Sequence, residues 1–276
     1  MTRILIPLVL SAFLLLALAA GCRPSEKDTQ GAAATPRPTP AKPAPAATPP
    51  PQAASEPAPS TTGRLRAAFL VVDGVYGTEL MAPYDVLQHT ASHAAPGMEV
   101  FTVSPTGGPV TTFEGLRLTP QYGFKNAPAA DVLVVPSAQG SMEGDLKNQA
   151  LIAWVRKTGG RARHVVSLCD GAFVLAQAGL LDGVPATTFP ADYERFARTF
   201  PKVDLRINVS FVDAGKVLTS QGGAQSYDVA LHLVDKLYGP KVAQGIGKGL
   251  LIPWPPNPRT RTPFTVIAQP EESPAK

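Results

Sequence analysis

Cys169 is the residue of this sequence best placed to do chemistry. It stands in the stretch Ser167-Leu168-Cys169-Asp170-Gly171, after a run of strand-forming residues and before a helical pattern. Small residues two before and two after the cysteine fit the sharp turn of a nucleophile elbow, where bulky neighbours would clash. The free amides and dipole of the following helix favour a thiolate and hold a developing oxyanion. A buried cysteine that acts only as a small hydrophobe is the alternative.

Histidine, the usual base beside a cysteine nucleophile, is scarce in this chain. The four histidines are His89, His93, His164 and His232, and the last lies among Leu and Val residues typical of a helix core. Without a histidine base, a cysteine protease or amidase mechanism is disfavoured. Two cysteines and scattered histidines give no metal-ligand spacing, so we expect neither a metal nor another cofactor.

Strand-length apolar runs alternate with helical patterns in the middle of the chain. The runs are Ala67–Val72, Val100–Val103, Val132–Val135 and Val165–Leu168, and the helical patterns are Leu80–Ser92, Asp145–Thr158, Gly171–Ala178, Ala191–Phe200 and Ser226–Tyr238. This alternation predicts an α/β fold with a mostly parallel central sheet and helices on both faces. In such sheets the ligand site lies at the carboxyl ends of the strands, where Cys169 is expected.

Other segments add detail to this prediction. Val110–Leu118 and Arg206–Leu218 are typical of antiparallel additions, and the second is expected to turn at Asp213–Lys216. Gly159-Gly160 and Gly179 stand where helices are expected to end.

The N-terminus has the three parts of a secretory signal. Arg3 gives the positive start, Ile4–Leu18 is apolar, and Leu-Ala-Ala-Gly-Cys at 18–22 resembles a lipobox. The apolar run is shorter than the roughly 20 residues that span a bilayer comfortably. We therefore expect residues 1–21 to be removed and lipid on Cys22 to anchor the protein in the cell envelope, outside the cytoplasm. This places it on the periplasmic side of the outer or inner membrane, or on the outer face of the cell membrane. An ordinary signal peptide or an uncleaved anchor is the alternative.

Proline marks the limits of the folded part. Ten of the 30 prolines lie between Gly31 and Thr62, where the composition favours extended polyproline-II conformations over a packed core. We therefore predict a Pro/Ala-rich tether at 22–62, one domain at 63–254 and a proline-rich tail at 255–276. The formal net charge of +4 is mild and the basic residues are scattered, so no nucleic-acid partner is expected.

The segment around Cys169 resembles the DJ-1/PfpI superfamily. Val166–Thr188, which reads VSLCDGAFVLAQAGLLDGVPATT, is most similar to the branch with isonitrile hydratases and the amidase-like domains of certain transcription regulators. The likeness continues through Phe211–Gly239, and Glu79–Leu87 matches the acidic-x-x-x-Pro stretch after the family's first strand. It covers nearly all of Leu65–Trp254 and implies a flavodoxin-like sandwich. A homodimer is common among such proteins, so a second copy is a candidate partner.

The resemblance implies that Cys169 is the reactive cysteine and Glu79 its carboxylic partner. An ionised Glu79 beside a thiolate would raise the pKa of the thiol by like-charge repulsion, so one member of the pair has to hold a proton. A protonated Glu79 that donates to the thiolate can then act as general acid or base. The alternative is that Glu79 only caps the helix expected to start near Leu80.

The sequence departs from the family's pattern in three places, one of which is a pair of residues. Phe189 stands where members with a triad-like site have a histidine, and Ser137-Ala138 replaces a Gly-Gly pair. The amide of Ala138 is expected to serve an oxyanion hole, without the close approach that glycine permits. Asp170 follows the cysteine where smaller or hydroxylated residues are common, and its carboxylate either hinders thiolate formation or positions water.

These residues favour a hydratase or lyase that acts on a small electrophile, an isonitrile or a reactive carbonyl. Addition of water needs no histidine: Cys169 attacks, Glu79 shuttles the proton, and the amides of Cys169 and Ala138 stabilise charge. The alternatives are a redox sensor based on oxidation of Cys169 and a non-catalytic binder of small molecules. A transcription regulator is disfavoured, because no helix-turn-helix pattern follows the domain.

Overall fold

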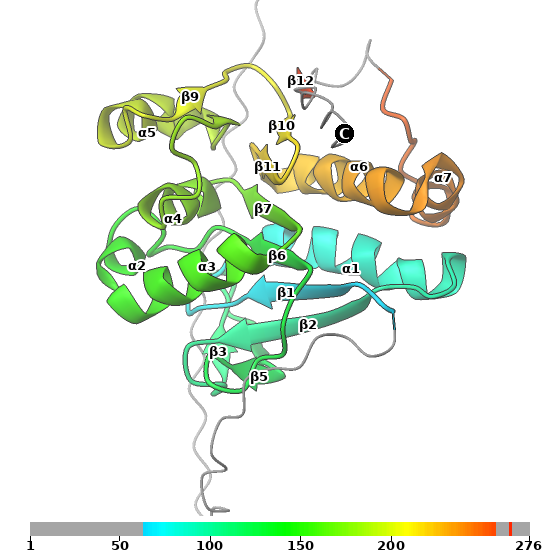
Figure 1. The fold of residues 1–276 in the computed structure, drawn as a ribbon, viewed down its shortest axis with the longest axis horizontal. Coiled ribbons are helices and arrows are strands. Elements are labelled where there is room, and N and C mark those ends of the chain that lie inside the picture. The colour runs from blue at the N-terminus through cyan, green and yellow to red at the C-terminus, as the bar shows by residue number, and fades with distance from the viewer. Residues whose placement is uncertain (1–62, 258–264, 267–276) are drawn as a thin grey trace, which may run out of the picture. The chain divides into compact units, whose positions relative to one another are not determined.

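A computed structural model describes residues 63–257 and 265–266 of the chain. Its centre is an eight-stranded sheet in the order β12-β10-β11-β7-β6-β1-β2-β5 (Figure 1). The strands are β1 (Arg66–Leu70), β2 (Glu99–Ser104), β5 (Tyr122–Gly123), β6 (Val132–Val135), β7 (His164–Leu168), β10 (Phe211–Ala214), β11 (Val217–Ser220) and β12 (Thr265–Val266). All neighbours run parallel except β10 and β11.

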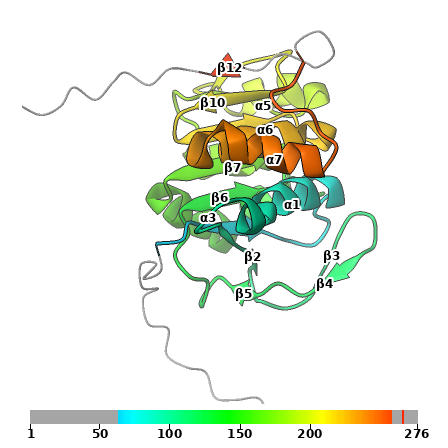
Figure 2. The ribbon, with the colours of Figure 1, turned by 90° about the vertical axis from the view of Figure 1, so that its right-hand side faces the viewer.

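Helices cover both faces of this sheet (Figures 1 and 2). On one face α1 (Gly77–His93), α6 (Ser226–Tyr238) and α7 (Pro240–Gly249) pack against one another. On the other face lie α2 (Gly144–Lys147), α3 (Gln149–Arg161), α4 (Gly171–Gln177) and α5 (Tyr193–Thr199). The flavodoxin-like α/β arrangement predicted from the sequence is confirmed.

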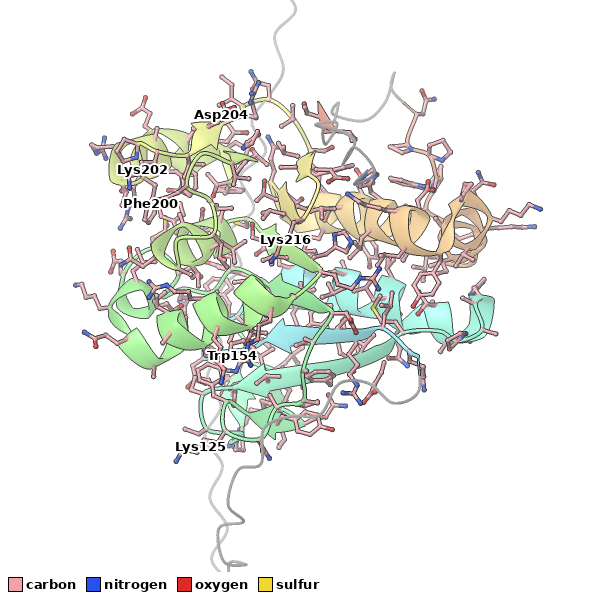
Figure 3. All side chains as sticks on the ribbon, viewed as in Figure 1. Lys125, Trp154, Phe200, Lys202, Asp204 and Lys216 are labelled. Atoms are coloured by element: carbon pink, nitrogen blue, oxygen red, sulfur yellow. The ribbon has the colours of Figure 1, made fainter. Side chains whose placement is uncertain are left out.

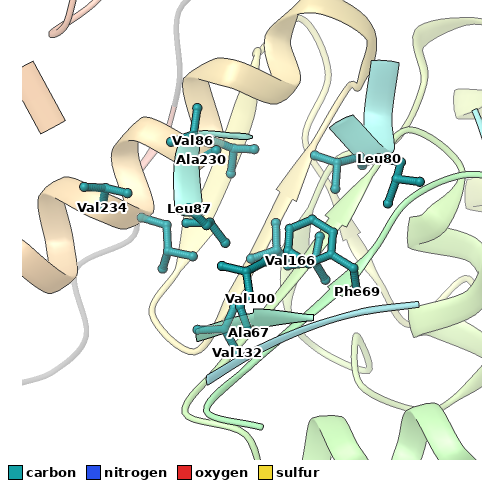
Figure 4. Packing of buried hydrophobic residues seen from close by; sticks show 14 of the residues in the cluster. Ala67, Phe69, Leu80, Val86, Leu87, Val100, Val132, Val166, Ala230 and Val234 are labelled. Atoms are coloured by element: carbon teal, nitrogen blue, oxygen red, sulfur yellow. The ribbon is translucent and has the colours of Figure 1, made fainter. Parts of the chain in front are cut away.

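The core on the α1 side fixes the strands that lead to Cys169. Phe69 of β1 and Val166 of β7 lie in one buried cluster with Leu80 of α1 and Val234 of α6 (Figure 4). Every residue of β6 is buried, because helices cover both sides of the sheet. This explains why these strands are continuously apolar rather than alternating.

Aromatic contacts fix the opposite face. Phe173 of α4 packs edge-on against Phe196 and Phe200, with ring centroids 4.9 and 5.9 Å away. Trp154 of α3, which is labelled in Figure 3, stacks on Phe124 with the ring centroids 4.6 Å apart. The helix that begins beside Cys169 is therefore held firmly on its buried side.

Two predicted helix boundaries are wrong. The helix expected at Asp145–Thr158 is two helices, because the side chain of Asn148 caps α3 by accepting a backbone N–H at 3.1 Å. Gly159 and Gly160 lie inside α3 rather than at its end. A Cβ on Gly159 would lie 2.6 Å from Leu180 Cδ1, so this glycine serves close packing and not helix termination.

The two predicted antiparallel additions have different outcomes. β10 and β11 pair antiparallel around the expected turn and extend the main sheet. Val110–Leu118 instead forms a separate hairpin from β3 (Val110–Thr111) and β4 (Arg117–Leu118). Glu114 at the hairpin tip accepts the Gly77 N–H at 3.0 Å, so the hairpin caps the start of α1. This tertiary contact is absent from any local pattern.

Several short elements were not predicted. They are α7, β5, the parallel pair β8 (Pro185–Ala186) and β9 (Asp204–Leu205), and the single-turn helices η1 (Pro190–Asp192) and η2 (Gly223–Gln225). Thr265 and Val266 of the predicted tail form β12 beside β10. No helix within the described ranges is long and apolar enough to span a membrane. The expected signal at 1–21, lipid site at Cys22 and tether at 22–62 lie outside the described residues.

Candidate active site

Cys169 lies at a sharp turn between β7 and α4. Its φ of +52° is in the left-handed region that residues with a side chain rarely adopt. A Cβ on Gly171 would lie 2.1 Å from the carbonyl oxygen of Val135, so only glycine fits two residues after the cysteine. The backbone therefore has the strain and the steric limits that the nucleophile-elbow pattern predicts.

Glu79, in the first turn of α1, is brought to Cys169. A Cβ placed on Gly222 would lie 2.5 Å from Cys169 Cβ and 2.8 Å from Glu79 Oε1, so both side chains flank this glycine. Glu79 Oε1 accepts the Gly223 N–H at 3.3 Å, and the Ser137 N–H also donates to the carboxyl. Glu79 is thus held against the cysteine rather than capping the helix that contains it.

The pKa values of Glu79 and Cys169 are both raised. Burial is the main cause for Glu79, and the charge of Asp170 adds to it, while hydrogen bonds from Gly223, Cys169 and Ser137 oppose the rise. Burial also raises the pKa of the Cys169 thiol far above its usual range, and the charges of Glu79 and Asp170 raise it further. Glu79 Oε2 is buried without a hydrogen-bond partner, which suits a protonated carboxyl.

The expectation that the helix N-terminus would favour a thiolate is wrong for the resting site. The Asp170 N–H does bond to the sulfur and lowers its pKa. Burial and the two neighbouring carboxyls outweigh this one donor. The cysteine therefore rests as a neutral thiol.

Asp170 is a second carboxyl at the sulfur. The Cys169 thiol donates to Asp170 Oδ2 at 3.8 Å, and Thr188 Oγ1 lies 3.1 Å from Asp170 Oδ1. Burial, followed by the charge of Asp192, raises the pKa of Asp170 to about 6. The hydrogen bonds from Thr188 and Cys169 and the charge of Arg195 act against this rise. Asp170 is ionised at neutral pH and takes up a proton in mild acid.

The amides expected to form an oxyanion hole already have acceptors. The Ala138 N–H donates to Ser141 Oγ at 2.8 Å. The Cys169 N–H donates to the carbonyl oxygen of Ser220 at 2.9 Å. The assignment of both amides to charge stabilisation is therefore wrong for this conformation, since each would first have to release its partner.

Ser137 and Phe189, two of the departures from the family pattern, lie in different surroundings. Ser137 is buried, donates its N–H to Glu79, and accepts the Tyr76 N–H on its carbonyl at 3.0 Å. Its hydroxyl is buried without a partner. Phe189 is 42% exposed and supplies neither an acid nor a base. Of the two, Ser137 positions the carboxyl of the site.

Tyr76 and Thr188 belong to the site but were not identified from the sequence. Burial raises the pKa of Tyr76, and the charges of Cys169, Glu79 and Asp170 raise it further. The phenol therefore lies within electrostatic range of all three groups. Thr188 carried a signal, because it ends the segment that resembles the family. Tyr76 carried none beyond its place between the first strand and Glu79.

The four histidines make their contacts elsewhere. His89 and His93 contact backbone carbonyls one turn earlier in α1. His164 contacts a carbonyl in the β10–β11 turn, and His232 Nε2 lies 2.8 Å from Asp213 Oδ2. In residues 63–257 and 265–266, no group of three or more His, Cys, Asp or Glu side chains is arranged to hold a metal ion. The described residues of the site are thus a thiol, two carboxyls, a phenol and hydroxyls.

Comparison with known proteins assigns this arrangement to a family. The model of the DJ-1/PfpI family matches residues 65–236. The chain belongs to the DJ-1/PfpI family. Isonitrile hydratase of Pseudomonas putida is 33% identical over 180 residues, which cover 65% of this chain and 75% of that protein. The HTH-type transcriptional regulator GbdR of Pseudomonas aeruginosa is 26% identical, but the match covers only 48% of the regulator.

Solved structures agree with this assignment at the level of the fold. A ThiJ/PfpI family protein from Pseudomonas syringae superposes with a TM-score of 0.63 at 24% identity, covering 71% of this chain and 78% of the other. DJ-1beta of Drosophila melanogaster superposes with a TM-score of 0.60 at 20% identity, covering 69% of this chain and all of the other. At these identities the likeness shows the fold alone.

Proposed function

We propose that this DJ-1/PfpI protein is a cysteine-dependent hydratase that adds water to a small electrophilic carbon, an isonitrile or a reactive carbonyl. The observation that carries the proposal is the buried pair of Cys169 and Glu79 at the carboxyl ends of the strands. Cys169 is the nucleophile and Glu79 the proton shuttle. The similarity to an isonitrile hydratase supports this class of substrate.

The reaction balances with these groups alone. With an isonitrile, the sulfur of Cys169 bonds to the terminal carbon, and Glu79 gives that carbon a proton that the site regains from the thiol. The product is a thioimidate. Water then adds to the same carbon, a proton goes to nitrogen, and the carbon–sulfur bond breaks. A formamide leaves, and the thiol and the carboxylic acid are restored.

Turnover of isonitriles and 2-oxoaldehydes by purified protein tests the proposal. Cys169→Ala is expected to abolish turnover, and Glu79→Gln to lower kcat/KM by about 10²- to 10⁴-fold, because the acid is lost but the fold is kept. Glu99→Gln is the matched control, since Glu99 lies at the amino end of β2, away from the site, and full activity is expected. Absence of turnover over a panel of small electrophiles, with the thiol intact, contradicts the proposal.

A second candidate is a ligand-binding protein without turnover. The engaged amides of Ala138 and Cys169 favour it, because they leave the site without these two oxyanion donors. Such a protein would bind a small electrophile or its hydrate, and Cys169→Ser would keep the affinity measured by calorimetry. Redox sensing is less well supported, because the raised pKa of the thiol leaves little thiolate to react with peroxide. A gain of two oxygens at Cys169 after mild peroxide would reverse that judgement.

We also propose that the domain, predicted at 63–254, works outside the cytoplasm. The support is the sequence at 18–22, in which small residues precede Cys22, together with the proline-rich segment that follows. Cys22→Ser is expected to move the protein from the membrane fraction to the soluble fraction without changing its activity. An unchanged membrane fraction would contradict lipid attachment at Cys22.

A further inference from the structure

Two carboxyl groups interact with the Cys169 thiol, and they approach it from different elements. Glu79 comes from the first turn of α1, and Asp170 follows the cysteine at the start of α4. Both side chains are buried, with 6% and 7% of their surface exposed. A single proton shuttle uses only one of them.

We propose that Asp170 is a second catalytic residue, the base that accepts the proton of Cys169, while Glu79 is the acid that protonates the substrate carbon. This assignment rests on the proposed hydratase function and gives its two proton transfers to two different groups.

The hydrogen bonds of the two carboxyls support this division. Both oxygens of Asp170 have donors: the Cys169 thiol is 3.8 Å from Oδ2, and the Thr188 hydroxyl is 3.1 Å from Oδ1. These two donors partly offset the effect of burial, so that Asp170 remains ionised at neutral pH. Glu79 Oε1 accepts the Gly223 N–H at 3.3 Å, and the Ser137 N–H and the Cys169 thiol also interact with this carboxyl. Its Oε2 is nevertheless buried without a hydrogen-bond partner. A protonated Oε2 is less costly to bury unpaired than a charged one.

The charges around Asp170 fit the role of a base at neutral pH. Asp192 of η1 and Glu79 of α1 are acidic neighbours, and Arg195 of α5 is the basic one. Together with burial they leave the pKa of Asp170 at about 6. An ionised Asp170 in turn raises the pKa of Glu79 and keeps the proton there.

The proton transfers balance over one turnover with an isonitrile. As sulfur bonds to carbon, the thiol proton moves to Asp170 and the Glu79 proton moves to the carbon. Water then adds to that carbon, giving one proton back to Glu79, while Asp170 gives its proton to nitrogen. When the carbon–sulfur bond breaks, the proton of the new hydroxyl passes through Asp170 to sulfur. Formamide, thiol, Asp170 carboxylate and Glu79 acid are the final state.

Alkylation of Cys169 by iodoacetamide between pH 5 and 9 tests the base without requiring turnover. For the full chain, the rate is expected to rise with a midpoint near the Asp170 pKa of about 6 and then level off. In Asp170→Asn the plateau is expected to be lost, with the rate rising about tenfold per pH unit up to pH 9, because only free thiolate then reacts. This loss of the plateau is expected even though removal of the Asp170 charge also lowers the pKa of the thiol. Asp182→Asn, an exposed carboxyl beyond α4, is the matched control with an unchanged profile.

Turnover and alkylation assays together distinguish the possible results. If isonitriles are hydrated, Asp170→Asn is expected to lower kcat/KM by about 10²-fold or more and to remove the acid limb of its pH profile. If they are not hydrated but the alkylation midpoint is present and lost in Asp170→Asn, the hydratase proposal fails and the base assignment holds. A folded Asp170→Asn with the unmodified protein's profile overturns the assignment.

Thr188→Val provides the test if Asp170→Asn does not fold. Removing the Thr188 hydroxyl removes a hydrogen bond that lowers the pKa of Asp170, so the alkylation midpoint is expected to move to higher pH. A folded Thr188→Val with an unmoved midpoint overturns the assignment, because a merely structural carboxyl would leave the midpoint where it is.

Discussion

Asp170 and Asp213 are both buried aspartates, yet their pKa values move in opposite directions. Burial alone would raise the pKa of Asp213. Hydrogen bonds from His232 Nε2 at 2.8 Å, from Lys236 Nζ at 3.0 Å and from the Gly215 N–H together outweigh burial and lower it. Asp170 has hydroxyl and thiol donors instead, and acidic neighbours keep its pKa high.

The two aspartates lie at opposite ends of the strands of the central sheet. Asp213 is beside the β10–β11 turn, near the amino end of β7, whereas Asp170 follows the carboxyl end of β7. The difference shows that burial alone does not set the direction in which the pKa of a carboxyl moves, because the facing groups decide it. Asp213 faces the cation of Lys236 and the donors His232 and Gly215 N–H. Asp170 has hydroxyl and thiol donors, but its acidic neighbours and burial outweigh them and Arg195, at a cost in stability.

The largest effect is expected when the well-paired aspartate is removed. Asp213→Ala leaves Lys236 and His232, which are 31% and 16% exposed, beside a vacated acceptor. We expect the free energy of unfolding at pH 7 to fall by about 3–5 kcal/mol, measured by urea denaturation. A loss below about 1 kcal/mol would mean that the cluster around Asp213 contributes little.

Asp170→Asn is expected to have the opposite sign. The carboxyl has a pKa of about 6 against an ordinary value of 3.8, so its charged form is disfavoured in the folded state. Neutral asparagine removes that penalty, and the free energy of unfolding at pH 7 is expected to rise by about 1–3 kcal/mol. The same variant is expected to lose the pH plateau of Cys169 alkylation, so that stability rises while the base is lost. Destabilisation would contradict the electrostatic account.

The pH dependence of that gain sharpens the comparison. Because the folded state binds the Asp170 proton more tightly than the unfolded state, Asp170 lowers stability as the pH rises from about 4 to about 6. The gain from Asp170→Asn is therefore expected to be largest above pH 6 and to vanish near pH 4. Asp213 works the other way: its pKa is lowered, so its contribution is present at neutral pH and is lost as the pH falls. Urea denaturation from pH 4 to 8 measures both trends, and a gain that does not change with pH contradicts the first.

The smallest effect is expected for an exposed carboxyl. Asp182 pairs with Lys202 at 3.2 Å, with side chains 53% and 77% exposed (Figure 3 labels Lys202). Asp182→Asn is expected to change the free energy of unfolding by less than about 0.5 kcal/mol, because water and salt screen the pair. A loss comparable to that of Asp213→Ala would show that pairing matters at the surface as much as in the interior.

Local sterics made part of the site predictable. The turn at Cys169 followed from the small residues around it, because Gly171 has no room for a Cβ. The pairing of Glu79 with Cys169 was predicted from the family resemblance alone, because the two residues are 90 positions apart and no local spacing relates them. The partners of the Ala138 and Cys169 amides could not be predicted, because Ser141 and Ser220 are fixed by loop and strand geometry.

In the fold, too, features set by local sequence were predictable and features set by tertiary contacts were not. Continuous apolar runs predicted the parallel strands, since burial on both faces removes the need for alternation. The start of α7 does have a sequence signal, because Gly239 is followed by Pro240, which stands at the start of the helix. The β3–β4 hairpin is antiparallel as predicted, but it lies apart from the main sheet and contacts α1. That contact joins residues distant in the sequence and could not be predicted from a local pattern.

The position of β12 has a consequence for the tendency of the protein to aggregate. Thr265 and Val266 of β12 pair with Val212 and Asp213 of β10, so the outer edge of β10 is already paired there. A chain shortened to residue 257 would leave that edge of β10 unpaired, and unpaired strand edges pair with other chains and promote aggregation. We therefore expect the pairing of these two residues with β10 to limit aggregation, independently of any chemistry at Cys169.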